Sequence, residues 1–277
     1  MKYMEQKRKR IPLVAVILLG IAVLSSFAAN WIAPFSADVM DSQAINLPPD
    51  GTHLLGTDFM GRDLFSMLLY GGRTSLWIGF LSGLVSFAIA LVYGTVSGLA
   101  GERIDNLMMR FTELLLSIPS ILLILFLQAI WGAGTSFSVA IVIGVTGWMN
   151  MAKVIRSEVR QIGKSDYILA AKLMEGSFPY IMLRHLLPNF VSSVMFMAVT
   201  NIGRAILTES TLSFLGLGLP LTVVSWGSLL SMSQDALLSG SWWLIVAPGL
   251  TLVTVLVCIT EIGEYARKKN NRLYSNL

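Results

Sequence analysis

Residues 75–100 read SLWIGFLSGLVSFAIALVYGTVSGLA, a run that contains no Asp, Glu, Lys or Arg. About 20 consecutive apolar residues are enough for a helix to cross the roughly 30 Å hydrocarbon core of a bilayer. This stretch therefore predicts a membrane-spanning helix. Gly79 and Gly83, like Gly94 and Gly98, have the small-x-x-x-small spacing that lets helix backbones approach closely in lipid. We expect this helix to pack tightly in a bundle.

The composition of the whole chain agrees with a membrane protein. Hydrophobic residues make up 55% of its 277 residues and charged residues only 13%, whereas a soluble domain carries roughly a quarter charged residues. The single cysteine, Cys258, lies in an apolar run, so the chain can form no internal disulfide and we expect a buried thiol. These proportions exclude an ordinary soluble domain and predict an all-α, polytopic membrane protein.

Six transmembrane helices are predicted in total. The fourth is short and is expected to continue as a helix past Lys153, and Pro119 is expected to kink the third. The apolar stretches that are long enough to span a bilayer lie at residues 11–33, 75–100, 107–131, 137–151, 190–215 and 242–262.

The distribution of Lys and Arg predicts the orientation of these helices, because basic residues favour the cytoplasmic side of a membrane. Of the 20 basic residues, all but Arg62, Arg73 and Arg204 fall in residues 1–10, 101–110, 153–188 and 266–277. Both terminal tails (1–10 and 266–277) and the loop 153–188 are therefore predicted to be cytoplasmic. Residues 34–74 are then extracytoplasmic, and residues 75–265 form a five-helix core that includes the loop.

A second interpretation of the N-terminus stays open. The basic tail and the first apolar span also fit a cleaved signal peptide, with Ser26-Phe27-Ala28 as a cleavage-like site. Cleavage there would leave five spans and an extracytoplasmic N-terminus.

The predicted extracytoplasmic segment begins as a loop and ends as a helix. Pro48-Pro49-Asp50-Gly51 is a turn signal. Asp58 is expected to cap a short helix through Leu64 and Leu69 that lies on the membrane surface. In the outer loop 216–241 and just beyond it, Trp226 and Trp242-Trp243 are expected either to anchor the outer interface or to stack on a solute.

Two charged residues lie well inside a predicted span, away from its ends, where an unpaired charge costs several kcal/mol. These are Arg204 and Glu209. One interpretation is that both face a central cavity and contact a polar solute. The other is a structural ion pair, or a Glu209 that lies near the outer interface. Near the cytoplasmic end of the third span, Glu113 is expected to pair with Arg110, three residues away.

The sequence contains no recognisable catalytic or metal-binding set. His53 and His185 are the only histidines and are predicted to lie on opposite sides of the membrane, so neither a metal site nor a Ser/His/Asp set is expected. No Gly-rich phosphate loop with a following Lys is present, so the chain is not expected to bind ATP by that route. We therefore expect no cofactor, and a membrane-embedded enzyme is the least favoured function.

The loop 153–188 is predicted to form two short helices. Asp166 can cap the first, Gly176 can end it, and Pro179 can begin a second helix that stops before Pro188. Such a loop could lie on lipid headgroups. It could also be a docking element that fits a groove of a soluble motor domain.

Residues 167–189 resemble the cytoplasmic "EAA" loop of ABC importer permeases. Ala170-Ala171 and Arg184-His185-Leu186-Leu187-Pro188-Asn189 match, whereas Leu169 stands where the family has Glu, and Glu175 where it has Gly. The resemblance implies that this loop couples the chain to an ATPase. The residues that it implies as the coupling surface are Asp166, Tyr167, Ala170, Ala171, Gly176, His185, Leu187 and Pro188.

Other motifs are similar to those of the dipeptide, oligopeptide and nickel permeases. Leu55-Gly56-Thr57-Asp58 with Gly61-Arg62-Asp63 and Gly72-Arg73-Thr74-Ser75-Leu76 resembles the family's LGTDxxGRD…GxRxSL region. Further matches, in order along the chain, are Met109-Arg110-Phe111-Thr112-Glu113 to Ile118-Pro119, Gly147-Trp148 with Lys153-Val154-Ile155-Arg156, Glu209 to Leu212-Ser213-Phe214-Leu215-Gly216-Leu217-Gly218, and Ser225-Trp226-Gly227.

This resemblance implies a type I ABC importer permease fold and a C-type permease subunit in a prokaryotic cytoplasmic membrane. It implies a homologous second permease, two ATPases that bind ATP and Mg, and an extracytoplasmic solute-binding protein. The cargo would be a peptide, nickel or a metal chelate. On this basis Arg204 and Glu209 would line the translocation pathway, and a polytopic scaffold or sensor without an ATPase is the alternative. The residues expected to dock the binding protein are Asp58, Arg62, Asp63 and Trp226.

Overall fold

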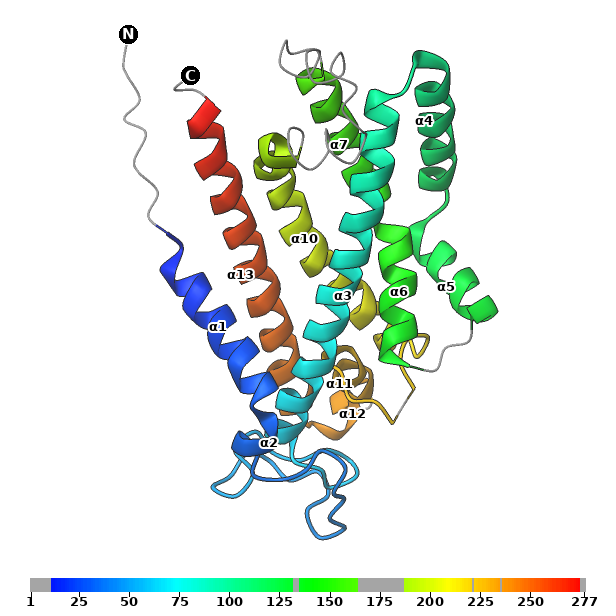
Figure 1. Cartoon of the computed structure of the whole chain (residues 1–277). Coiled ribbons are helices and arrows are strands. Elements are labelled where there is room, and N and C mark those ends of the chain that lie inside the picture. Colours follow the sequence, from blue (N-terminus) through cyan, green and yellow to red (C-terminus); the bar gives the residue numbers. More distant parts are fainter. Residues whose placement is uncertain (1–10, 132–134, 164–186, 221, 235, 275–277) are drawn as a thin grey trace.

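The computed structural model describes residues 11–131, 135–163, 187–220, 222–234 and 236–274. Within these ranges the secondary structure is helical, and the only extended pairing is an isolated bridge between Thr57 and Asp63. Three long helices stand side by side: α3 (Leu64–Leu99), α10 (Leu187–Phe214) and α13 (Trp243–Tyr274) (Figure 1). The shorter α1 (Leu13–Phe27), followed by the single turn α2 (Ala29–Ile32), packs against α3 and α13. The all-α prediction is confirmed for the described residues.

Two pairs of helices form bent units beside α3. The helices α4 (Glu102–Ser117) and α5 (Ser120–Trp131) meet at 90°, and α6 (Ser136–Gly147) and α7 (Met149–Ile162) meet at 45°. The first bend lies at Pro119, which has no N–H and whose ring clashes with the preceding turn. The predicted kink at Pro119 and the predicted continuation past Lys153 are both confirmed.

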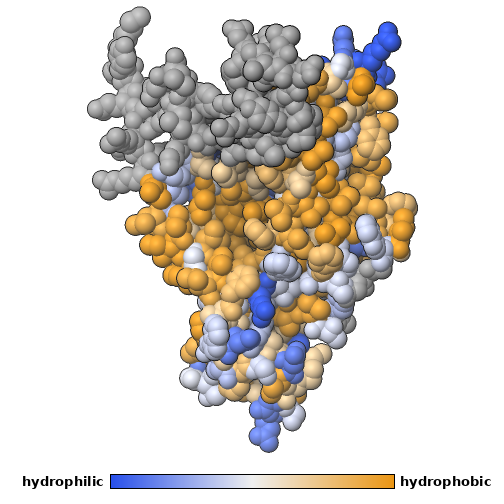
Figure 2. All heavy atoms as spheres, viewed as in Figure 1, coloured by the Kyte–Doolittle hydropathy of each residue, from blue (hydrophilic) through white to orange (hydrophobic). Residues whose placement is uncertain are grey.

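Length and composition identify two helices that could each cross a membrane, α3 and residues Trp243–Lys268 of α13. The number rises to four if each bent pair counts as one span, while α1 is apolar but shorter. Apolar side chains cover the middle of the face seen in Figure 2, and more polar ones gather at its lower end. Up to four of the six predicted spans are therefore supported by the described helices, and the other two remain a prediction.

The start of α3 differs from the sequence prediction. Asp63, and not Asp58, caps the helix, because its carboxylate accepts the backbone N–H of Ser66 at 2.8 Å. The Asp58 carboxylate instead accepts a hydrogen bond from the Arg62 side chain. Gly61 has φ +74°, outside the helical region. No separate surface helix forms, since the helix runs without a break from Leu64 to Leu99.

The paired glycines of α3 allow close packing against two different helices. A Cβ added at Gly83 would lie 2.7 Å from the Ile202 side chain of α10, and one at Gly94 would lie 2.7 Å from the Ala152 carbonyl of α7. The tight packing predicted from their spacing is confirmed. It places α3 at the centre of the bundle, between α10 and α7.

The tryptophans of the outer loop differ in burial. Trp226 and Trp243 belong to the core cluster that joins α3, α11 (Trp226–Met232) and α13, and are 1% and 8% exposed. Trp242 is 59% exposed. The expectation that these residues anchor an interface is therefore wrong for Trp226 and Trp243, because both indole N–H groups are bonded inside the protein, to Leu68 and Thr57 carbonyls. The remaining short helix of this loop is α12 (Ala236–Ser239).

The ends of the helices fall into two groups. The start of α1, the end of α7 and the end of α13 lie at one end of the bundle, and residues 34–63 lie at the other (Figure 1). We call residues 34–63 the loop cap. This arrangement is what a chain with both tails on one side of a membrane requires.

Candidate transport pathway and loop cap

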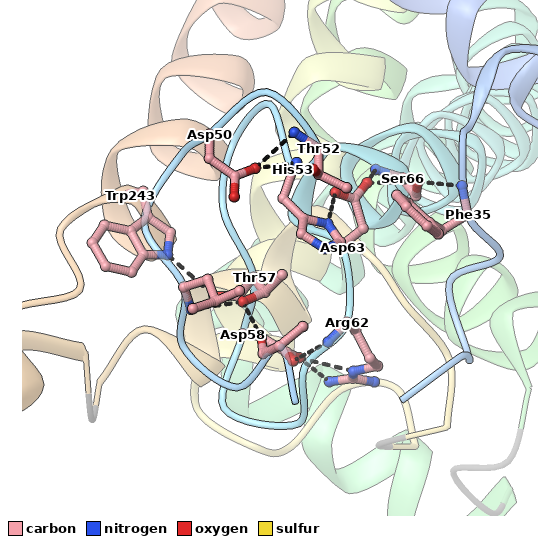
Figure 3. A network of polar contacts seen from close by, with 12 residues as sticks. Phe35, Asp50, Thr52, His53, Thr57, Asp58, Arg62, Asp63, Ser66 and Trp243 are labelled. Carbon is pink, nitrogen blue, oxygen red and sulfur yellow. Dashed lines mark hydrogen bonds and ion pairs between the residues drawn. The ribbon is translucent and has the colours of Figure 1, made fainter. Parts of the chain in front are cut away.

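A buried ion pair lies at the centre of the loop cap. The Asp58 carboxylate accepts the Arg62 Nε–H at 2.8 Å and lies 2.7 Å from an Arg62 terminal nitrogen, and the two side chains are only 3% and 8% exposed (Figure 3). Both contacts with the Arg62 side chain are made by Asp58 Oδ2, and Asp58 Oδ1 accepts the backbone N–H groups of Met60 and Arg62. Hydrogen bonds between two ionised groups are among the stronger ones in proteins. This pair fixes the turn between Asp58 and Arg62.

Asp63 connects the loop cap to the helix bundle. One of its oxygens accepts the backbone N–H and the hydroxyl of Ser66, and the other lies 3.0 Å from His53 Nδ1 (Figure 3). The Trp243 indole donates to the Thr57 carbonyl at 3.1 Å, which adds a contact to α13. The motif residues at 56–63 therefore hold the loop cap against α3 and α13.

The exposed turn of the loop cap has its own anionic group. Asp50 accepts the backbone N–H groups of His53 and Thr52, and these bonds lower the pKa of its carboxyl below the usual value. Asp50 remains ionised at neutral pH and keeps the turn that Pro48-Pro49-Asp50-Gly51 predicted.

Gly61 is the position in the loop cap that tolerates a side chain least. Its φ is +74°, and a Cβ there would overlap the backbone of Asp41. We expect Gly61→Ala to lower the free energy of unfolding by about 2–4 kcal/mol, because strained backbone and a steric overlap act together. Thermal unfolding of the purified protein in detergent measures the change. Gly51→Ala is the matched control, since a Cβ at Gly51 meets no atom within 4 Å. Equal melting temperatures for the two variants would contradict this account.

The four residues expected to dock a binding protein are all buried. Asp58, Arg62, Asp63 and Trp226 are 2%, 6%, 3% and 1% exposed. The prediction that they touch a partner directly does not fit these positions, because their polar groups are directed to atoms of the chain itself. The outer surface of the loop cap comes from neighbours such as Leu54 and Met60, which are 59% and 52% exposed.

A cavity of about 250 Å³ lies between α3, α10 and the two bent units. Arg204 reaches it from α10, and its guanidinium makes no ion pair within the described part of the chain. Pro119 lines the same cavity at the break between α4 and α5. The polar residues that line it with Arg204 are Ser86, Ser120, Thr146, Asn150, Asn201 and Thr208.

Glu209 does not share this cavity. Its side chain is fully buried and its carboxylate accepts hydroxyl groups from Ser213 and Ser225 at 2.8 Å and from Ser75 at 3.1 Å. Arg204 and Glu209 thus lie in different surroundings, and no ion pair joins them in the residues that the structure describes.

A second, more open cavity of about 750 Å³ lies near the loop cap. One wall comes from α3 with Tyr70, Arg73 and Trp77, and another from the segment 222–224. Asp38 of the loop cap also lines it. Arg73 and Asp38 are exposed, and neither makes an ion pair in the described ranges.

Sequence reasoning missed a buried acidic centre at the other end of the bundle. Asp105 is fully buried and bonds Arg156 through two nitrogens, Arg160 at 2.8 Å and the Ser97 hydroxyl at 2.6 Å. These contacts join α3, α4 and α7. The sequence offers only a weak signal for this centre, a pair of arginines four positions apart, Arg156 and Arg160, that could share one acidic partner. Asp105 is 51 or more positions away from them, so local patterns do not identify it as that partner.

Other predicted contacts have mixed outcomes. Glu113 pairs with Lys153 at 3.3 Å rather than with Arg110, because α7 brings the lysine across from a neighbouring helix. Of the predicted coupling residues, Leu187 and Pro188 form the first turn of α10. Asp166, Tyr167, Ala170, Ala171, Gly176 and His185 lie outside the described residues. Among the described residues, no group of three or more His, Cys, Asp or Glu could hold a metal ion.

Comparisons with known proteins give consistent results. The model of the family described as "Binding-protein-dependent transport system inner membrane component" matches residues 90–267. The dipeptide transport system permease protein DppC of Bacillus subtilis is 32% identical over 258 residues, covering 93% of this chain and 80% of that protein. The oligopeptide transport system permease protein OppC of Haemophilus influenzae is 33% identical over 262 residues, covering 94% and 84%.

A solved structure has a similar fold. It is a chain of the MetNI methionine ABC transporter in an inward-facing conformation, with a TM-score of 0.57 and 18% sequence identity. The match covers 74% of this chain and 96% of that chain. At this identity the likeness shows the fold alone, which is that of an ABC importer permease.

Proposed function

The chain belongs to the family of binding-protein-dependent transport system inner membrane components, and on that premise we propose that it lines the passage through which an ABC importer moves short peptides. Family membership makes it a membrane-embedded transport subunit, and ATP hydrolysis belongs to partner ATPases. The cargo, the positions of the pathway residues and the identities of the partners are the proposal.

The observation that carries the proposal is Arg204 in its cavity. A guanidinium within a membrane-spanning helix costs several kcal/mol unless it is paired or hydrated. Arg204 is exposed in the single chain, has no carboxylate partner among the described residues, and shares its cavity with amide and hydroxyl side chains as well as apolar ones. Such a residue is stable facing water in a passage between two permeases, and unstable facing lipid.

The charges along this route favour a peptide over a free metal cation. Arg204 repels a bare divalent ion, whereas the carboxylate of a peptide can form a charge-assisted hydrogen bond with it. The cavity near the loop cap presents one cation and one anion, Arg73 and Asp38, beside aromatic rings. A zwitterionic peptide offers groups that complement both. The relatives reported above are named as dipeptide and oligopeptide permeases, which agrees with this cargo.

The partners proposed are a homologous second permease, two ATPases and a solute-binding protein. The loop cap, at the predicted extracytoplasmic end, is the surface proposed for the binding protein. Asp58, Arg62, Asp63 and Trp226 serve there by holding the loop cap and α11 in shape, and exposed neighbours make the contact. Both tails are proposed to be cytoplasmic in the inner membrane of a prokaryote.

Coupling to the ATPases is proposed to run through residues 153–188. Closure of the ATPase dimer would move the loop, and α7 and α10 would transmit the motion to the passage. Gly176 lies outside the described residues, and its proposed role as a hinge rests on the sequence resemblance. If the role is correct, Gly176→Pro leaves membrane insertion intact and separates ATP hydrolysis from uptake. Unchanged uptake would contradict it.

The experiment that tests the cargo is uptake of labelled dipeptide and of radioactive nickel, measured side by side. Cells lacking this chain are compared with cells in which it has been restored. The proposal predicts loss of dipeptide uptake alone in the deletion and recovery on restoration. Loss of nickel uptake alone would overturn the peptide assignment while keeping the transport function.

A further inference from the structure

Glu209 lies at the centre of a buried polar cluster made of distant parts of the chain. Its carboxylate accepts hydroxyls from Ser75 of α3, Ser213 of α10 and Ser225, the residue that caps α11. Ser210 is a fourth, longer contact at 3.5 Å. No cation lies within ion-pair distance of Glu209 in the described residues. The carboxylate is therefore held by hydroxyl donors alone.

The contacts around Ser225 hold the start of α11 from two sides. Ser225 forms a capping box with Ser228, and the next backbone N–H, that of Trp226, donates to Ser75 at 3.1 Å. A Cβ at Gly227 would lie 2.5 Å from the Ser210 Cα, so α11 packs directly against the backbone of α10. Ser75, Ser213 and Ser225 come from three motifs recognised separately in the sequence, and they meet at Glu209 although Ser75 and Glu209 are 134 positions apart.

The same contacts set the position of one wall of the larger cavity. Residues 222–224, which line that cavity, immediately precede Ser225. Another wall is α3, with Arg73 and Trp77. Since Glu209 bonds Ser75 on α3 and Ser225 on the segment, it fixes the separation of the two walls. A substitution at Glu209 would therefore change the shape of this cavity, which we take as the solute entrance, without changing any residue that lines it.

We propose that Glu209 is a positioning residue for the solute entrance, which it shapes by binding the segment 222–226 to α3. It does not contact solute, because its side chain is completely enclosed. The role in uptake rests on the proposed transport function, whereas the position of the segment does not. The two can therefore be tested separately.

The test is thiol labelling in membranes that contain the complete importer. The buried Cys258 is first replaced by Ala. The reporter is Val224→Cys, in the wall that Glu209 holds, and the matched control is Thr74→Cys, a partly buried position on the α3 wall of the same cavity. Each is combined with Glu209 or with Glu209→Gln, and the rate of reaction with a membrane-impermeant maleimide is measured.

In the unchanged protein the serine hydroxyls donate to the Glu209 carboxylate. Glu209→Gln replaces one acceptor oxygen by an NH₂ group, so a donor then faces these hydroxyl groups. We expect the labelling rate of the Val224→Cys reporter to rise about tenfold, the effect of losing one hydrogen bond to a charged group, with no change at Thr74→Cys. Unchanged labelling at both positions would overturn the proposal, and so would an equal rise at both, which would mean general loosening.

A second variant covers the case in which Glu209→Gln fails to reach the membrane. Ser225→Ala removes the hydroxyl that joins the segment to Glu209 and leaves the carboxylate in place. It must also speed labelling at the Val224→Cys reporter alone, and unchanged labelling would overturn the proposal. Labelling needs no transport, so this result stays distinct from failure of the peptide assignment, which uptake reports.

Discussion

Replacing Arg204 by Gln is expected to lower ATP-driven dipeptide uptake by about tenfold or more, since a hydrogen bond between charged groups contributes roughly 1.5–3 kcal/mol. Gln keeps much of the side-chain length but removes the one charged side chain that lines the smaller cavity among the residues that the structure describes. The variant loses the group that binds the peptide carboxylate. It also loses the charge that favours hydration of the passage. Initial rates in proteoliposomes with the complete importer measure the effect.

Two variants control this result. Arg204→Lys keeps the positive charge and is expected to retain most of the uptake. Arg110→Gln removes an exposed arginine of α4 that lines none of the described cavities, and is expected to behave like the unchanged protein. Full uptake by the Arg204→Gln variant would remove Arg204 from the pathway, and equal loss in the Arg110→Gln variant would show a general effect of charge.

Replacing Asp105 by Ala is expected to cost about 2–3 kcal/mol of stability, less than the roughly 3–5 kcal/mol seen when one partner of a fully buried ion pair is removed, because Arg156 and Arg160 are 24% and 40% exposed. Asp105 is fully buried and contacts both Arg156 and Arg160, so its loss leaves two neighbouring guanidinium groups without the carboxylate that they share. Both arginines lie on α7, within the predicted coupling loop 153–188. Thermal unfolding in detergent measures the loss, and we expect ATP hydrolysis and uptake to become uncoupled as well.

The matched control for Asp105 is Glu113→Ala. Glu113 lies on the same helix and pairs with the same α7, through Lys153, but the two side chains are 63% and 36% exposed. Pairs of this kind contribute only about 0–1 kcal/mol. If both alanine variants melted at the same temperature, burial of Asp105 would not be what makes its ion pairs important.

Features that depend on neighbouring residues could be predicted from the sequence. The apolar run at 75–100 is sufficient to specify a helix, and the four-residue spacing of Gly79 and Gly83 is sufficient to specify a close contact. The bend at Pro119 follows from local properties of proline, which lacks an N–H and whose ring clashes with the preceding turn. Each of these predictions agrees with the structure because no distant partner is needed to produce it.

Features that depend on competition between distant residues could not be predicted. Asp58 is as good a helix cap as Asp63, and only the pairing of Asp58 with Arg62 leaves Asp63 to begin α3. Glu209 was assigned to the pathway because a charge in a span needs water or a partner. Four serine hydroxyls from three regions of the chain provide that partner instead, and no local pattern reports them.

The motif residues of the loop cap illustrate a related limit. A resemblance identifies residues that a family uses, but it does not tell whether a residue contacts a partner protein or stabilises the structure around the contact. Asp58 and Arg62 look like surface charges in the sequence, and the structure buries both. Their expected effect on transport is therefore through the shape of the loop cap, and substitutions there are expected to change stability and uptake together.

The measurement that tests the central claim most directly is accumulation of labelled dipeptide in proteoliposomes that contain this chain with its second permease, ATPases and binding protein. The account predicts accumulation that requires ATP, stops when this chain is omitted and falls sharply in the Arg204→Gln variant. Accumulation that continues without this chain, or a complex that hydrolyses ATP in response to its loaded binding protein but moves no peptide, would contradict it.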